Sequence, residues 1–283
     1  MDPVRRVSQK FSREFISLRA SWSWVRSDFA DAFARLSDAG AFRPDGPSRM
    51  IWNTRNKFVL RATVSPGFDV IYKSFYRIRE HQQYYLRPSP SAQEALNYLQ
   101  LTGLGIPLPD VLAVGETRGK ADWYVIIGRF LRLTNSFLIV RFVDGFRDGS
   151  DFGIGGPFEK DEALLMEFCR GHLALLAKLH DAGILHRGFT PSNLMYRRDP
   201  DGMKFCWIDV ASCCRTSITT KKIADDIINL FRFLEIPGST RRELEAWYLK
   251  SSANPRTDLE TLSGVLEKRL IEVLKRKNRV PMP

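Results

Sequence analysis

The amino-acid sequence predicts an α+β fold with two lobes, a small lobe built on an antiparallel sheet with one helix and a mainly helical large lobe. Alternating apolar and polar residues dominate positions 52–142, whereas apolar residues at three- and four-residue steps dominate from position 161 onward. The chain has 283 residues, enough to bury a core in each of two lobes. We therefore expect an N-terminal extension over residues 1–50, the small lobe over 51–143 and the large lobe over 144–283.

Residues 1–50 form a basic stretch that is rich in aromatic side chains. Apolar residues recur in it at the spacing of one helix face; they are Phe11, Phe15, Leu18, Trp22 and Val25. This spacing predicts an amphipathic helix, followed by a linker at 40–48 that is rich in Gly, Pro and Asp. Such a helix packs on its own domain or, because its polar face is basic, lies on an anionic membrane.

The small lobe is predicted from short strands around one helix. Residues 57–64 and 68–76 alternate in polarity, and Ser65-Pro66-Gly67 between them favours a tight turn. A helix is expected over 91–101. The segment 103–116 then leads into another strand, and strands at 123–127 and 137–142 complete a five-strand prediction. Residues 142–145 are expected to connect the lobes and to offer backbone amides to an adenine edge.

Lys73 lies in the second predicted strand between apolar and aromatic neighbours, and Glu94 lies in the helix that follows. A lysine that binds nucleotide phosphates needs a carboxylate to hold its side chain extended, and kinases place that carboxylate on a helix beside the sheet. A single strand lysine more often faces solvent, so this pair supports nucleotide binding only together with residues of the large lobe. No GxGxxG sequence precedes Lys73, where residues 53–57 stand instead.

The large lobe is predicted from four amphipathic helices and one hairpin. The helices are expected over 161–182, 222–233, 240–251 and 257–275. The hairpin joins strands at 194–196 and 205–208 through the turn Asp199-Pro200-Asp201-Gly202. Asp225 and Asp226 are expected to open the second helix, where carboxylates complement the helix dipole.

Four polar residues of the large lobe follow the pattern of a kinase catalytic loop, in which HRDxxxxN precedes a hydrophobic strand and an aspartate. His186 and Arg187 begin the loop, Asn193 ends it, and Asp209 follows the hairpin. Asn193 and Asp209 would supply the amide and carboxylate oxygens that Mg²⁺ prefers. The pattern has one departure, because Gly188 stands where the catalytic aspartate is expected.

The charge balance and the cysteines indicate which partners and which compartment to expect. Lys and Arg number 43 against 32 Asp and Glu, a net charge of +11, which favours polyanions such as nucleotides, phosphorylated glycans or anionic lipid. Only this charge speaks for nucleic acid binding, since no RNP-like or helix-turn-helix pattern is present. The four cysteines lack metal-ligand spacing, and no apolar run fits a membrane span or signal peptide, which predicts a cytoplasmic protein with reduced thiols.

The segments that carry these residues resemble the bacterial lipopolysaccharide kinase family, the heptose and Kdo kinases of the inner core. The resemblance covers about residues 50–235 and rests on VIYKSF, AQEALNYL, GIPLPDVLAVGE, LHDAGILHRG, PSNLMY and WIDVAS. It implies a bilobal protein-kinase-like fold, ATP and Mg²⁺ as cofactors, and a sugar hydroxyl on a lipid-linked glycan as acceptor at the cytoplasmic face of the inner membrane. It also implies that Asp226 supports the backbone of the catalytic loop.

Gly188 separates two hypotheses about function. Loss of a general base costs about 10²- to 10⁴-fold in rate, but phosphoryl transfer depends mainly on positioning and charge neutralisation, for which the groups are present. The first hypothesis is therefore a slow ATP- and magnesium-dependent sugar kinase of lipopolysaccharide biosynthesis. The second is a pseudokinase that binds nucleotide or acts as a scaffold or regulator of envelope assembly.

Overall fold

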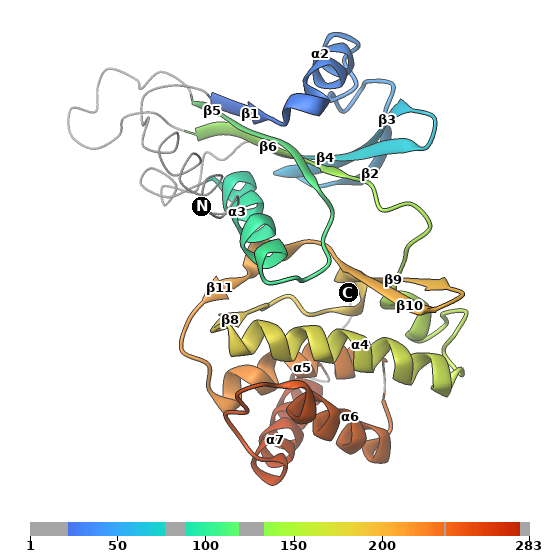
Figure 1. Cartoon of the computed structure of the whole chain (residues 1–283), viewed down its shortest axis with the longest axis vertical. Coiled ribbons are helices and arrows are strands. Elements are labelled where there is room, and N and C mark those ends of the chain that lie inside the picture. The colour runs from blue at the N-terminus through green and yellow to red at the C-terminus, as the bar shows by residue number, and fades with distance from the viewer. Residues whose placement is uncertain (1–21, 77–88, 119–132, 235, 278–283) are drawn as a thin grey trace, which may run out of the picture. The chain divides into compact units, whose positions relative to one another are not determined.

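The structure is a computed structural model that describes residues 22–76, 89–118, 133–234 and 236–277. The chain forms two compact units (Figure 1). One unit comprises the chain up to Gly103 together with Pro109–Asp144, and the other comprises Leu104–Leu108 together with the chain from Gly145 onward. Antiparallel strands dominate the first unit and helices the second, so the α+β prediction is confirmed.

A six-stranded antiparallel sheet forms the first unit, in the strand order β1-β5-β6-β4-β3-β2. Its strands are β1 (Trp22–Val25), β2 (Arg49–Asn53), β3 (Lys57–Ser65), β4 (Phe68–Tyr76), β5 (Val111–Arg118) and β6 (Leu133–Arg141). β3 and β4 lie where the alternating pattern predicted them. Gly67 in the turn between them has a φ of +74°, which glycine adopts at little cost. The strand predicted at 123–127 lies outside the described residues.

The two faces of this sheet carry different helices (Figure 1). One hydrophobic core cluster lies on the face that carries Tyr72, where α2 (Ala30–Asp38) contributes Phe33. α3 (Pro90–Gly103) lies against the other face, because its Glu94 contacts Lys73, which alternates with Tyr72 along β4. The sheet therefore separates this cluster from the face that carries Lys73, on which Leu138 and Val114 are also buried.

The prediction of an amphipathic helix in the N-terminal region is wrong for those of its residues that the structure describes. Residues 22–25 form strand β1, which pairs with β5, and the helix of this region is α2, further along the chain. Trp22 and Val25 are three residues apart, a spacing that fits one helix face. The open edge of β5 supplies backbone hydrogen-bond partners that the sequence pattern does not reveal, so strand pairing overrides the local preference. The rest of the predicted helix, residues 1–21, lies outside the described residues.

The second unit is mainly helical and has two small sheets. Its helices are α4 (Glu162–Asp181), α5 (Thr220–Leu234), α6 (Gly238–Ser251) and α7 (Leu259–Lys277), all close to the predicted positions. Its strands are β7 (Arg147–Asp148), β8 (Ile184–Leu185), β9 (Leu194–Asp199), β10 (Gly202–Trp207) and β11 (Cys214–Arg215). α4 packs on α6 and α5 packs on α7, while β9 and β10 form the predicted hairpin. These contacts hold the loop after β8 between α5 and the hairpin.

The prediction that Asp225 and Asp226 open helix α5 is wrong. The helix begins at Thr220, so both residues lie in its second turn, and its first turn carries no acidic residue. A favourable interaction with the helix dipole therefore does not explain these carboxylates. Their side chains have separate surroundings instead: Asp225 accepts from Arg269 near the surface, whereas Asp226 is buried.

All four cysteines are free thiols, and Cys169, Cys206 and Cys213 are buried. Burial raises the pKa of Cys206 to about 12, so this thiol stays protonated. Within the described ranges, no helix combines the length and the apolar character that crossing a membrane requires.

Candidate active site

In the first unit, Lys73 and Glu94 form a buried ion pair. The Nζ of Lys73 donates to the Oε1 of Glu94 at 2.6 Å, and the Glu94 side chain has no exposed surface. The Oε2 of Glu94 has no hydrogen-bond partner among the described residues. α3 thus holds a carboxylate against β4, and that carboxylate holds the lysine side chain in one position.

In the second unit, Asp226 organises the backbone of the predicted catalytic loop. Its Oδ2 accepts from the backbone N–H of His186 at 2.9 Å, and its Oδ1 accepts from that of Arg187 at 2.7 Å. The Nε2 of His180 lies 3.1 Å from the same Oδ2, and the Nδ1 of His180 lies 2.7 Å from the hydroxyl of Tyr248. Asp226 therefore has three partners from two elements, α4 and the loop. Nothing in the sequence pattern indicated the contribution of His180 or Tyr248.

The same loop contains a residue in an unfavourable backbone conformation. Arg187 has a φ of +61°, in the left-handed region, which costs a non-glycine residue about 1–2 kcal/mol. The hydrogen bond from its N–H to a charged carboxylate offsets this cost. Such strain is typical of functional loops that their surroundings hold in place.

Gly188 follows in a conformation that does not require glycine, since its φ is outside the left-handed region. Its carbonyl accepts from the Nδ2 of Asn193 at 3.0 Å, and its N–H donates to the Nδ1 of His186 at 3.3 Å. A Cβ at this position would lie 3.0 Å from the Oγ of Ser212. The loop therefore keeps its hydrogen bonds without the aspartate, and the Ser212 hydroxyl stands beside the position where that side chain would start.

Asn193 and Asp209 lie on neighbouring segments at the open end of the β9–β10 hairpin, Asn193 just before β9 and Asp209 two residues after β10. The N–H of Ile208 donates to the carbonyl of Asn193 at 2.9 Å, directly before Asp209. Because the Nδ2 of Asn193 is bound to Gly188, its amide oxygen remains as the group for a cation. One carboxylate and one amide oxygen fit Mg²⁺, which prefers oxygen ligands and keeps several waters. Within the described part of the chain, no group of three or more His, Cys, Asp and Glu side chains is arranged to hold a metal ion.

Two neutral histidines lie buried here, His172 of α4 and His186 of the loop itself. The Nε1 of Trp207 donates to the Nδ1 of His172 at 2.9 Å, and the His186 ring packs edge-on against the Trp207 ring with centroids 5.0 Å apart. Burial lowers the pKa of His172 to about 3 and the pKa of His186 to about 4. Both rings therefore act as uncharged packing and hydrogen-bonding groups at neutral pH.

These lowered pKa values predict acid sensitivity of the second unit. An unfolded histidine has a pKa of about 6.5, so between about pH 6.5 and 4 the unfolded state binds more protons than the folded state. The free energy of unfolding should then fall by roughly 1.4 kcal/mol per pH unit for each histidine as the pH decreases. Urea unfolding monitored by tryptophan fluorescence at several pH values measures this slope. His172→Gln keeps an acceptor for Trp207 and should halve the slope; an unchanged slope would contradict the explanation.

The predicted residues thus form two groups, each defined within its own unit. Lys73 and Glu94 contact each other in the first unit. The second unit brings together the remaining six, His186, Arg187, Gly188, Asn193, Asp209 and Asp226. Ser212 was missed, because only the folded loop places it beside Gly188.

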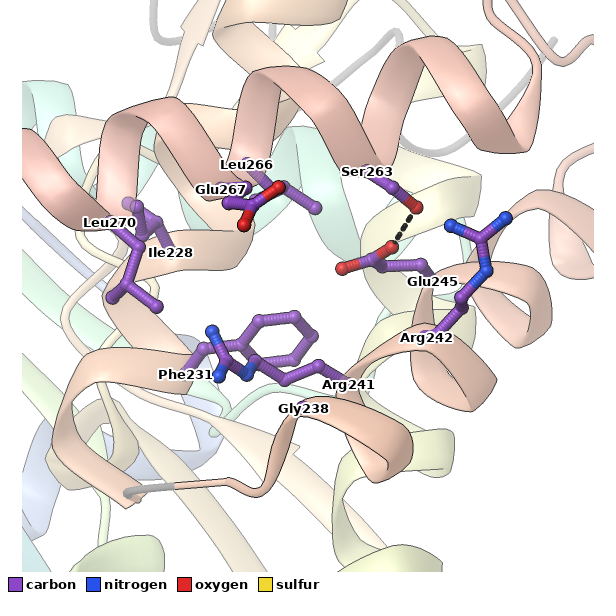
Figure 2. A pocket seen from close by; sticks show the side chains of 10 residues that line it. All are labelled: Ile228, Phe231, Gly238, Arg241, Arg242, Glu245, Ser263, Leu266, Glu267 and Leu270. Carbon is purple, nitrogen blue, oxygen red and sulfur yellow. Dashed lines mark hydrogen bonds between the residues drawn. The ribbon is translucent and has the colours of Figure 1, made fainter.

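A separate cavity of about 230 Å³ lies among α5, α6 and α7 (Figure 2). Glu245 points into it and accepts a hydrogen bond from Ser263, and burial raises the pKa of the Glu245 carboxyl. Arg241 and Glu267 also line this cavity, so charges of both signs meet in it. It contains none of the residues predicted from the sequence and is distinct from the loop described above.

Comparison with known proteins gives a family match and a structural match. The model of the lipopolysaccharide kinase (Kdo/WaaP) family matches residues 78–249, more than half of the chain. A solved structure described as WaaP in complex with acyl carrier protein is similar with a TM-score of 0.61 at 15% sequence identity, over 90% of this chain and 97% of that one. None of the curated proteins compared by sequence matches. The structural likeness supports the predicted kinase-like fold.

Proposed function

Because the chain belongs to the lipopolysaccharide kinase (Kdo/WaaP) family, we propose that it is an ATP- and magnesium-dependent kinase that phosphorylates a sugar hydroxyl of the lipopolysaccharide core. The observation that carries this proposal is the buried contact of Lys73 with Glu94. Burying two charges costs desolvation free energy that their attraction often fails to recover, so stability alone does not account for such a pair. A lysine held ready for nucleotide phosphates does account for it.

Each group has a distinct part in the proposed reaction. Lys73 binds phosphate oxygens of ATP, and Asn193 and Asp209 hold the magnesium ion, which when bound neutralises charge on the phosphates. The sugar hydroxyl oxygen bonds to the γ-phosphorus, the bond to the β–γ bridging oxygen breaks, and ADP leaves. Because Gly188 offers no carboxylate, the hydroxyl proton passes to the transferred phosphoryl group or to water. For this reason we expect transfer to be slower, by about 10²- to 10⁴-fold, than in a kinase that has the catalytic aspartate.

A direct test incubates the purified protein with γ-labelled ATP, magnesium and isolated core glycan. We expect the label to appear in the glycan with the wild-type protein and to be absent with Asp209→Asn, which weakens the proposed metal site. Wild-type incorporation no higher than that of the variant would refute the proposal.

A pseudokinase is the alternative function, and Gly188 is the observation that favours it. The backbone at this position accepts an aspartate, but its Cβ would press on Ser212. We therefore expect Gly188→Asp combined with Ser212→Ala to raise kcat by about 10²- to 10⁴-fold while the KM for ATP stays the same. Slow wild-type transfer together with this gain supports a kinase that works without the base. If the wild type shows no detectable transfer and the double variant does, the result supports a pseudokinase that has lost the catalytic base.

The proposed acceptor is lipid-linked, so we place the protein at the cytoplasmic face of the inner membrane, in peripheral contact with anionic lipid. The net charge of +11 supports this location.

The similar solved structure is a complex with acyl carrier protein, and the same partner is a further hypothesis for this chain. Co-purification of a tagged chain from its host, followed by mass spectrometry, tests that hypothesis.

A further inference from the structure

Two large apolar side chains stand exposed next to each other on the edge strand β2. Trp52 is 61% exposed and Ile51 is 51% exposed. Single exposed apolar residues are common on proteins, whereas exposed apolar side chains that form a contiguous patch mark binding surfaces. What Trp52 can bind depends on the face of the sheet on which its side chain lies.

A β-bulge decides the orientation of Trp52. Met50 pairs with Leu60 of the core face, and regular pairing would then place Trp52 opposite Phe58, also on the core face. The register shifts between Met50 and Trp52, so that Trp52 pairs with Val59 instead. Ile51 is the extra residue of the bulge. Bulges of this kind redirect side chains near functional sites, and here the bulge turns the indole away from the core.

The strand register then places Trp52 in one row with the predicted phosphate-binding lysine. Trp52 pairs with Val59, and Val59 pairs with Lys73. Directly paired residues of antiparallel strands point to the same face, so the three side chains lie on the face opposite the core. Two strand spacings separate Trp52 from Lys73, about 10 Å. Val59 between them is only half-buried, which leaves an apolar surface beside the lysine.

The turn after Trp52 is held by side chains. The hydroxyl of Thr54 accepts from the N–H of Lys57 at 3.1 Å and donates to its carbonyl at 3.0 Å. The hydroxyl of Tyr76 donates to the carbonyl of Thr54 at 2.7 Å. This turn occupies the place where kinases carry a mobile glycine-rich loop. It therefore fixes the position of Trp52 relative to β4.

We propose that Trp52 is a nucleobase-binding residue, whose indole covers the base of the nucleotide that Lys73 binds through its phosphates. This inference rests on the proposed function and deepens it. An indole offers a large apolar surface on which any base stacks, at little cost in side-chain entropy. The half-buried Val59 continues the same surface toward the lysine.

Calorimetric titration with ATP and with inorganic tripolyphosphate, both with magnesium, tests the proposal. We expect Trp52→Ala to weaken ATP binding roughly tenfold, as loss of one base–aromatic stack does, and Trp52→Phe to restore most of the affinity. Tripolyphosphate has no base, so its affinity should be the same for wild type and both variants. Trp247→Ala, which removes another exposed tryptophan, should leave the ATP affinity unchanged. Because Trp52 is largely exposed, circular dichroism should show the same fold for all variants.

Each other outcome has a definite meaning. Equal ATP affinity of wild type and Trp52→Ala would overturn the role of Trp52 while the proposed function stands. Absence of ATP binding by the wild type would overturn both. A Trp52-dependent change in fluorescence with anionic phospholipid vesicles, and none with ATP, would assign this surface to lipid and overturn the nucleobase proposal.

Discussion

Replacing Lys73 with methionine is expected to destabilise the first unit by about 3–5 kcal/mol and to abolish ATP binding. The stability loss arises because Glu94 has no exposed surface and would be left as a buried carboxylate without its cation. The loss of binding arises because the phosphates lose the proposed lysine. Urea unfolding gives the first quantity and calorimetric titration with ATP and magnesium gives the second.

The double variant Lys73→Met with Glu94→Gln separates these two effects. It removes both charges, so we expect it to regain most of the stability but none of the ATP affinity. A double variant as unstable as the single one would contradict the explanation based on a buried unpaired charge. Recovery of ATP binding in the double variant would contradict the role of Lys73.

Asp226→Ala is expected to destabilise the second unit by about 3–5 kcal/mol, because the backbone N–H groups of His186 and Arg187 and the ring of His180 lose their acceptor. It should also abolish transfer, since the loop would no longer hold Asn193 in position. The neighbouring carboxylate provides a matched control on the same helix. Asp225 is 41% exposed and pairs with Arg269, so Asp225→Ala should cost less than about 1 kcal/mol.

Thermal and urea unfolding of both variants measure this difference, and the transfer assay with labelled ATP measures the functional part. Equal losses of stability in Asp225→Ala and Asp226→Ala would show that the three hydrogen bonds to Asp226 do not organise the loop. Full transfer activity in Asp226→Ala would show that the reaction does not depend on these hydrogen bonds.

Local sequence patterns predicted the elements whose stability is mainly local. The alternation in β3 and β4 and the apolar stripes of α4 and α7 depend on which face of each element is buried, and that information is in the sequence. Lys73 and Glu94 were predicted as a pair because nucleotide chemistry requires them together, and their side chains do meet. Chemistry thus supplied a long-range contact that no periodic pattern contains.

Features that depend on pairing between distant segments were missed. β1 exists because β5 offers it an edge, and the orientation of Trp52 depends on a one-residue bulge in its pairing with β3. Asp225 and Asp226 were placed at the start of a helix expected from residue 222, but the helix begins at Thr220, after Thr219, whose hydroxyl accepts from the N–H of Lys222. The position of Ser212 beside Gly188 likewise appears only once the loop is folded.

We propose that ATP binding by this chain requires Lys73 and that its magnesium dependence requires Asp209. Thermal shift with ATP, with and without magnesium, tests it most directly in the wild type, Asp209→Asn and Lys73→Met with Glu94→Gln. We expect a magnesium-dependent rise in melting temperature for the wild type, corresponding to about 2.7 kcal/mol at an ATP concentration of 100 times Kd. Asp209→Asn should lose the magnesium dependence, and the double variant should lose the shift. A wild type that ATP and magnesium do not stabilise, or variants that respond as it does, would contradict the claim.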